Sequence, residues 1–277
     1  MGGVARPASR GQLRFLSARL FLARPPRTPI GVLSVLLAVG VWQAVLSAGL
    51  VPSSLVPPPE AVWRAFVDIL RHGYRDTTLP EDVGATLGRC LAGFGLGALL
   101  GVPFGVWMGV NRRAAASFGW IVQFMRPLPP LSFLVLLILW LGLGEASKIA
   151  LLTMTAFPII VTASQGAVHG VPALQIAAAR SLGARPQQVF RHVVLPASLP
   201  MIFTGLSIAL AATFSTVVAA ELLAANDGLG WMVLSASKFL RNDIIMVGII
   251  LLGLFGMLLS WLLLLLDRRV VHWRGRA

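Results

Sequence analysis

Residues that could perform catalysis or hold a metal ion are few in this 277-residue chain, and none has the spacing of a familiar active site. Neither of the two lysines, Lys148 and Lys238, lies in the glycine pattern of a nucleotide-binding P-loop. The four histidines fall in four separate regions, and Cys90 is the only cysteine. We therefore expect no enzyme active site, no cofactor, no metal site and no internal disulfide.

One polar segment is a better candidate for function. Residues 177–196 read AAARSLGARPQQVFRHVVLP and contain three arginines but no acidic residue. Pro172 and the alanine-rich stretch after it predict a short helix, Gly183 predicts its end, and Pro186 predicts the start of a second one. The segment is thus expected to form a compact knob of two short helices with a glycine hinge.

The composition shows what surrounds this knob. Hydrophobic residues make up 57% of the chain and charged residues only 12%, whereas a soluble domain carries about 25% charged residues. A membrane-spanning helix needs about 20 apolar residues, and six such runs occur. We therefore predict an all-α polytopic membrane protein. The runs are Ile30 to Gly49, about Thr86 to Val110, about Phe118 to Leu141, about Ile149 to Ala167, about Ser198 to Leu223, and Ile244 to Leu266.

The third run is interrupted by Arg126 and by three prolines, Pro127, Pro129 and Pro130. The distribution of charge predicts the orientation of all six. Fifteen arginines lie in the two terminal segments and in the segments that follow the second and fourth runs, where Asp267 is the single acidic residue. The other connecting segments hold eight acidic residues and five basic ones. Because cytoplasmic loops are enriched in Lys and Arg, both termini and the knob are expected in the cytoplasm, and the net charge of +13 requires no nucleic acid partner.

Two further patterns predict packing. Residues 57–70 place apolar side chains at helical spacing, which is typical of an amphipathic helix on the outer membrane surface. Within the second run, glycines recur every fourth residue. Such spacing favours a close helix–helix contact, although a generic glycine-rich membrane helix would look similar. These glycines are Gly93, Gly97, Gly101, Gly105 and Gly109.

The knob resembles the cytoplasmic signature loop of ABC-importer permeases. That family has Glu-Ala-Ala, three residues, Gly, nine residues, then an aliphatic residue, any residue and Leu-Pro. Here Ala177-Ala-Ala, Gly183 and Val193-Val-Leu-Pro196 match, except that Ala177 replaces the family's glutamate. The stretches RPLPPLS from Arg126, WLGLGEASK from Trp140 and AAELLAANDGLGW from Ala219 resemble the nitrate, sulfonate and taurine branch. The likeness covers about residues 56–274.

The resemblance implies a type I importer transmembrane fold with six spans. We expect a basic cytoplasmic tail at 1–29, a permease domain at 30–266 with a coupling loop at about 168–197, and a basic tail at 267–277. The implied partners are an ATP-binding subunit dimer, a second permease copy, an extracytoplasmic solute-binding protein and the lipid bilayer. The resemblance implies a multi-pass protein of a bacterial plasma (inner) membrane. Its implied function is the ATP-driven import, by alternating access, of a small anionic or zwitterionic solute such as a sulfonate, taurine or nitrate.

Two groups of site residues follow from the residues and the resemblance together. The ATPase-coupling group comprises Ala177, Ala178, Ala179, Leu182, Gly183, Ala184, Phe190, Val193, Leu195 and Pro196. The possible pathway or gate group comprises Arg126, Thr213, Ser215, Thr216 and Glu221. Arg126 is either a cationic anchor at the membrane interface or a group that attracts an anionic solute, and the hydroxyls either line a pore or bond neighbouring helices.

Three alternatives remain. A permease of the same family for another solute, such as a vitamin precursor, would share the scaffold. An ion-coupled secondary transporter usually needs a carboxylate inside the membrane, and the middle thirds of the six runs contain none. A membrane-embedded enzyme would need a polar catalytic pair within the spans, which the sequence does not display.

Overall fold

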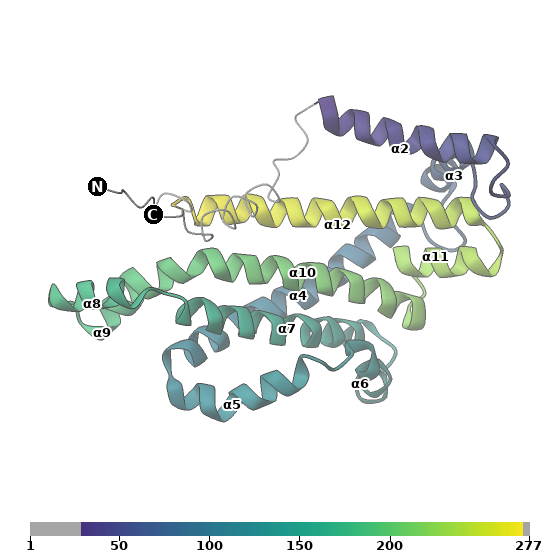
Figure 1. Ribbon diagram of the computed structural model, residues 1–277. Coiled ribbons are helices and arrows are strands. Elements are labelled where there is room, and N and C mark those ends of the chain that lie inside the picture. The colour runs from purple at the N-terminus through teal and green to yellow at the C-terminus, as the bar shows by residue number, and fades with distance from the viewer. Residues whose placement is uncertain (1–28, 274–277) are drawn as a thin grey trace, which may run out of the picture. The chain divides into compact units, whose positions relative to one another are not determined.

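The computed structural model describes residues 29–273 (Figure 1). The chain divides into two units, 1–61 and 62–277. In the described part of the first unit, α2 (Pro29–Ser47) covers the first predicted apolar run. Most of its side chains, including Val32 and Leu33, are exposed. The predicted basic tail before residue 29 lies outside the described residues, as do Arg274 and Arg276.

The regular elements of the second unit are helices, and no strand occurs in residues 29–273 apart from one isolated bridge between Tyr74 and Thr77. This agrees with the predicted all-α class. Its helices are α3 (Pro59–His72), α4 (Leu79–Val110), α5 (Arg112–Met125), α6 (Leu134–Leu141), α7 (Glu145–His169), α8 (Ala173–Ser181), α9 (Pro186–Val189), α10 (Leu195–Ala224), α11 (Leu229–Lys238) and α12 (Asn242–Val270).

Four described helices are long and apolar enough to cross a membrane, namely α4, α7, α10 with the turns before it, and α12. They coincide with the second, fourth, fifth and sixth predicted runs. Within the second unit, α7, α10 and α12 run roughly side by side (Figure 1). The short helix α11 lies between α10 and α12 in the chain, in a region where the sequence analysis predicts no element.

The third predicted run is broken at its prolines, where the sequence indicates an interruption. Residues 118–141 fold as the end of α5, a break and α6, and the two helical pieces meet at 92°. Pro127, Pro129 and Pro130 occupy the break, and proline removes the backbone donor and clashes with the preceding helical turn. A single 3₁₀ turn, Pro130–Phe133, leads into α6. The pair is therefore a broken span or a re-entrant loop, which gives a fifth crossing only if both pieces count as one.

The glycine pattern of α4 is a close helix–helix contact, as predicted. A Cβ atom added to Gly93 would lie 2.3 Å from the Cβ of Leu152, and one added to Gly97 would lie 2.6 Å from the Cβ of Ala156. At Gly105 the obstacle is the backbone oxygen of Val161, at 2.5 Å. Gly101 and Gly109 also face α7. The absence of side chains along this face lets α4 and α7 pack along almost their whole length.

Helix α7 forms the centre of the second unit. Its residues Leu151, Leu152, Ala156 and Val161 have no exposed surface. On its other side it approaches α10, where a Cβ on Gly205 would lie 2.2 Å from that of Ala163. Because α4 and α10 both contact α7 closely, the segments at the two ends of α7 are held apart at opposite ends of one packed unit.

The predicted amphipathic helix is α3, which buries Val62, Ala65 and Ile69. Trp63 and Leu70 on its other faces are exposed. The helix therefore buries one face against protein.

Candidate functional site

The predicted knob forms at the end of the second unit where α7 ends and α10 begins, and it projects beyond the neighbouring helices (Figure 1). Helices α8 and α9 are joined by a turn in which Gly183 has a φ of +81°, a conformation that glycine adopts without strain. The Ala184 N–H donates to the Ala179 carbonyl at 3.1 Å. A π-helical turn, Phe190–Val194, then continues into α10.

The knob packs one side into a buried cluster that it shares with Val106 of α4 and Val168 of α7, and its tip is exposed. Val189 and Val194 are buried, and half-buried Ala179, Ala184, Phe190 and Val193 pack against this cluster. The remaining predicted coupling residues divide in two. Ala177, Ala178, Leu182 and Gly183 are exposed, while Leu195 and Pro196 are half-buried at the start of α10.

Leu182 is 89% exposed, at the edge of a shallow hollow that Gly183, Gln188 and His192 also line. Covering an apolar side chain that is so exposed removes its surface from water, which lowers the free energy of the complex that covers it. The knob therefore offers an apolar tip beside a concave surface.

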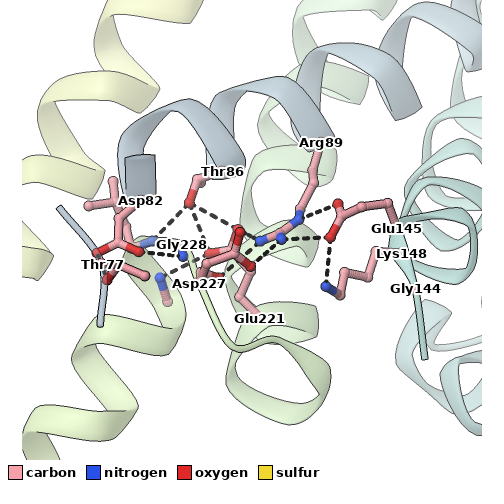
Figure 2. A network of polar contacts seen from close by, with 12 residues as sticks. Thr77, Asp82, Thr86, Arg89, Gly144, Glu145, Lys148, Glu221, Asp227 and Gly228 are labelled. Atoms are coloured by element: carbon pink, nitrogen blue, oxygen red, sulfur yellow. Dashed lines mark hydrogen bonds and ion pairs between the residues drawn. The ribbon is translucent and has the colours of Figure 1, made fainter. Parts of the chain in front are cut away.

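At the opposite end of α7 lies a buried cluster of charged side chains (Figure 2). Arg89 of α4 is only 3% exposed and donates to both carboxylate oxygens of Glu145, at 2.6 and 2.7 Å. It also donates to Glu221 of α10 at 2.9 Å and to the Asp227 carboxylate. Lys148 donates to Glu145 at 2.9 Å. One guanidinium thus joins α4, α7 and α10, as well as the loop after α10.

The same cluster fixes the loop between α10 and α11. Glu221 has no exposed surface, and it accepts hydrogen bonds from the Thr86 hydroxyl and from the Gly230 N–H, each at 2.9 Å. The Gly228 N–H donates to Asp82 at 2.7 Å. Gly228 has a φ of +106°, and a Cβ there would lie 2.5 Å from the Glu221 carboxylate. Only glycine fits this position, and the carboxylate can therefore approach the loop backbone closely.

The sequence analysis does not single out Arg89, although a signal for it exists. An arginine inside an apolar helix is costly unless a carboxylate neutralises it, so its position predicts an acidic partner. The partners come from positions 145, 221 and 227, and only the packing of α4 on α7 and α10 selects them. Glu221, predicted as a pathway or gate residue, lies within this cluster.

A cavity of about 360 Å³ lies where the third span is broken. Two of the predicted pathway residues, Arg126 and Thr216, line it together with Thr155. The apolar part of the wall consists of Met125, Leu128, Pro130, Phe133, Met154, Pro158, Ile159 and Ala212. The cavity thus brings together one cation and two hydroxyls from the α5–α6 break, α7 and α10.

Thr213 and Ser215 do not line this cavity. Thr213 is fully buried and donates to the Ala209 carbonyl of its own helix at 2.7 Å, so this bond neither faces the cavity nor joins two helices. Ser215 is exposed.

A family model for the binding-protein-dependent transport system inner membrane component matches residues 101–272, more than half of the chain. The chain belongs to this family. The match contains the broken span, the knob and α10 to α12, whereas Arg89 lies before its first residue.

Curated permeases match over nearly the whole chain. The taurine transport system permease protein TauC of Escherichia coli (strain K12) is 38% identical over 95% of this chain and 96% of its own length. The putative aliphatic sulfonates transport permease protein SsuC of Bacillus subtilis (strain 168) is 30% identical over 96% of each chain. The nitrate import permease protein NrtB of Leptolyngbya laminosa is 30% identical over 84% of each.

A solved structure has the same fold. The inward-facing MetNI methionine ABC transporter superposes with a TM-score of 0.57 at 25% identity, over 68% of this chain and 92% of that one. The chain is therefore a multi-pass membrane permease with an ABC-importer fold, and the resemblance inferred from the knob motif is confirmed.

Proposed function

We propose that this permease is the membrane-spanning subunit of an ATP-driven, binding-protein-dependent importer for small sulfonates or related anionic and zwitterionic solutes. The observation that carries this proposal is the knob, a preformed projection with an exposed apolar tip, in a chain 38% identical to a taurine permease subunit. Its place would be the plasma (inner) membrane of a bacterium, with six crossings, both termini in the cytoplasm and the permease domain at 30–266.

The energy source in this proposal is a separate ATPase, because the sequence contains no P-loop motif. Two permease copies would line the path, and an ATPase dimer would hold one knob of each copy. Closure of the ATPase would draw the knobs together and tilt the packed helices α4, α7 and α10 between outward-open and inward-open states. An external binding protein would deliver the solute, and no nucleic acid takes part.

The knob can drive this change only if its contacts differ between the two states, since a contact equal in both shifts nothing. Gly183 is the residue on which its shape depends. A side chain there would meet nothing within 4 Å, so the effect of a substitution comes from the positive φ, which costs an L-residue about 1–2 kcal/mol.

Co-purification with candidate ATPases, followed by Gly183→Ala and Gly183→Asp, tests the proposal. Alanine adds only backbone strain, whereas aspartate also places a charge at the surface that the proposed ATPase would contact. We expect Gly183→Ala to weaken coupling slightly and Gly183→Asp to uncouple ATP hydrolysis from uptake while insertion stays normal. Wild-type uptake and ATPase stimulation in Gly183→Asp would refute the coupling role. Uptake of a vitamin precursor instead of taurine would assign the permease to another solute.

A further inference from the structure

We propose that the cavity at the broken span binds one small solute by two ends, an anionic group at Arg126 and a hydrogen-bond-donating group at Thr155 and Thr216. This inference rests on the proposed import function and deepens it, because it names a zwitterion such as an aminosulfonate as the preferred solute. A plain anion would satisfy only half of the site.

The cavity lies at a break in a helix pair. Within a bilayer, irregular backbone is tolerated only where protein buries it or where it lines a cavity. The 92° break between α5 and α6 is such a segment, and Thr155 and Pro158 place it beside the middle of α7. The volume of about 360 Å³ falls at the lower end of the range for small-molecule sites, about 300–1,000 Å³. A small solute fits the space.

Arg126 can bind the anionic end of such a solute. Within residues 29–273, the one hydrogen bond found for the Arg126 side chain is a long one, 3.5 Å to Gln123. This contrasts with Arg89, whose guanidinium is fully engaged by carboxylates. A guanidinium presents five N–H donors in a plane and can hold two oxygens of one anion. Arg126 therefore retains donors for a sulfonate or carboxylate at the cavity.

Two threonine hydroxyls supply hydrogen-bond acceptors to the same cavity. The Thr155 hydroxyl donates to the Leu151 carbonyl at 2.9 Å, and the Thr216 hydroxyl donates to the Ala212 carbonyl at 2.9 Å. Each hydroxyl hydrogen is thereby occupied, while the oxygen keeps lone pairs that can accept. An ammonium group is a donor without acceptor capacity, so it complements these oxygens.

The apolar part of the cavity wall suits a short carbon chain. Met125, Phe133 and Met154 supply apolar surface to the same cavity as Arg126 and the two threonines. A solute with an anion at one end, one or two methylene groups and an ammonium at the other end would contact all three kinds of surface. Nitrate and simple alkylsulfonates lack the donor and would leave the threonine oxygens unused.

Equilibrium binding to the purified full-length permease tests this site directly. Radiolabelled taurine is the probe, and ethanesulfonate, which lacks the ammonium group, is the competitor. We expect wild type to bind taurine at least about tenfold more tightly than ethanesulfonate, since one hydrogen bond to a charged group is worth about a factor of ten or more. Thr155→Val with Thr216→Val should weaken taurine binding about tenfold and leave ethanesulfonate within about twofold. Arg126→Gln should weaken both.

Matched controls separate the site from general damage. Thr162→Val changes a hydroxyl on the same helix that donates to the Pro158 carbonyl but does not line the cavity. Arg113→Gln removes a cation from the same helix as Gln123, and it should leave binding unchanged.

The possible outcomes keep this inference apart from the proposed function. Equal affinity of wild type for taurine and ethanesulfonate would overturn the zwitterion preference. No effect of Arg126→Gln, or no taurine binding by a permease whose complex still imports taurine, would overturn the site while leaving the importer function standing. A complex with no ATP-driven uptake would instead refute the proposed function itself.

Discussion

Arg89 provides the sharpest test of the structure, because its removal has different consequences for its three carboxylate partners. Arg89→Met keeps an unbranched, apolar side chain of useful length and deletes the cation. Glu221 would then be a buried carboxylate without exposed surface and without its counter-charge. The Glu145 and Asp227 side chains are 54% and 43% exposed, so water can solvate them once the guanidinium is gone.

The expected magnitude follows from this asymmetry. Removing one partner of a buried ion pair costs about 3–5 kcal/mol, because the other charge stays buried. Partners that are half exposed contribute about 1 kcal/mol or less. Nearly all of the loss in Arg89→Met should therefore come from Glu221. Adding Glu221→Gln removes the stranded charge, keeps an oxygen for the donors of Thr86 and Gly230, and should recover about 2 kcal/mol or more.

Thermal unfolding of the detergent-solubilised permease measures this effect. With about 2–4 °C per kcal/mol for a chain of roughly this size, the midpoint should fall by about 6 °C or more in Arg89→Met. It should rise again in the double variant with Glu221→Gln. Glu145→Gln is the control and should shift the midpoint by only about 2–4 °C.

Two results would refute this reasoning. If Arg89→Met melts within about 2 °C of wild type, Glu221 is not stranded and the cluster does not hold α4 against α10. If Glu221→Gln worsens Arg89→Met, the buried charge is not the source of the loss.

The α4–α7 contact and the knob can each be tested by single substitutions. Gly105→Ala should destabilise the permease by about 1–3 kcal/mol in the same thermal unfolding experiment, because its Cβ would lie 2.5 Å from a backbone oxygen. Gly95→Ala is the control and should be near neutral, since its Cβ would have nothing within 4 Å. Equal unfolding midpoints of the two variants would contradict the close α4–α7 contact. Leu182→Asp should reduce ATPase co-purification at least about tenfold without lowering the melting midpoint, and undiminished capture would show that the tip is not the contact. Arg185→Cys should react with an impermeant thiol reagent only from the cytoplasmic side, because the knob is proposed to lie in the cytoplasm. Cys90 is fully buried and should give no background labelling. Labelling from outside would show that the proposed orientation is inverted.

Local patterns were sufficient to predict much of this permease. Runs of apolar residues place α4, α7, α10 and α12 correctly, because a helix in lipid satisfies its own backbone and needs only length and hydrophobicity. The glycine spacing predicts the α4–α7 contact, because residues four apart share one helix face. Pro172, Gly183 and Pro186 predict the knob, since each acts on its own backbone.

The tertiary structure decided what lies between these elements. Arg89 meets Glu145, Glu221 and Asp227, which are 56, 132 and 138 residues away in the chain. Arg126, Thr155 and Thr216 share a cavity because the proline-rich break turns by 92° beside α7 and α10. The prolines predict an interruption but not its direction. The direction, and with it the set of partners of Arg89, depends on how helices distant in sequence pack against one another, and no local periodicity encodes that packing.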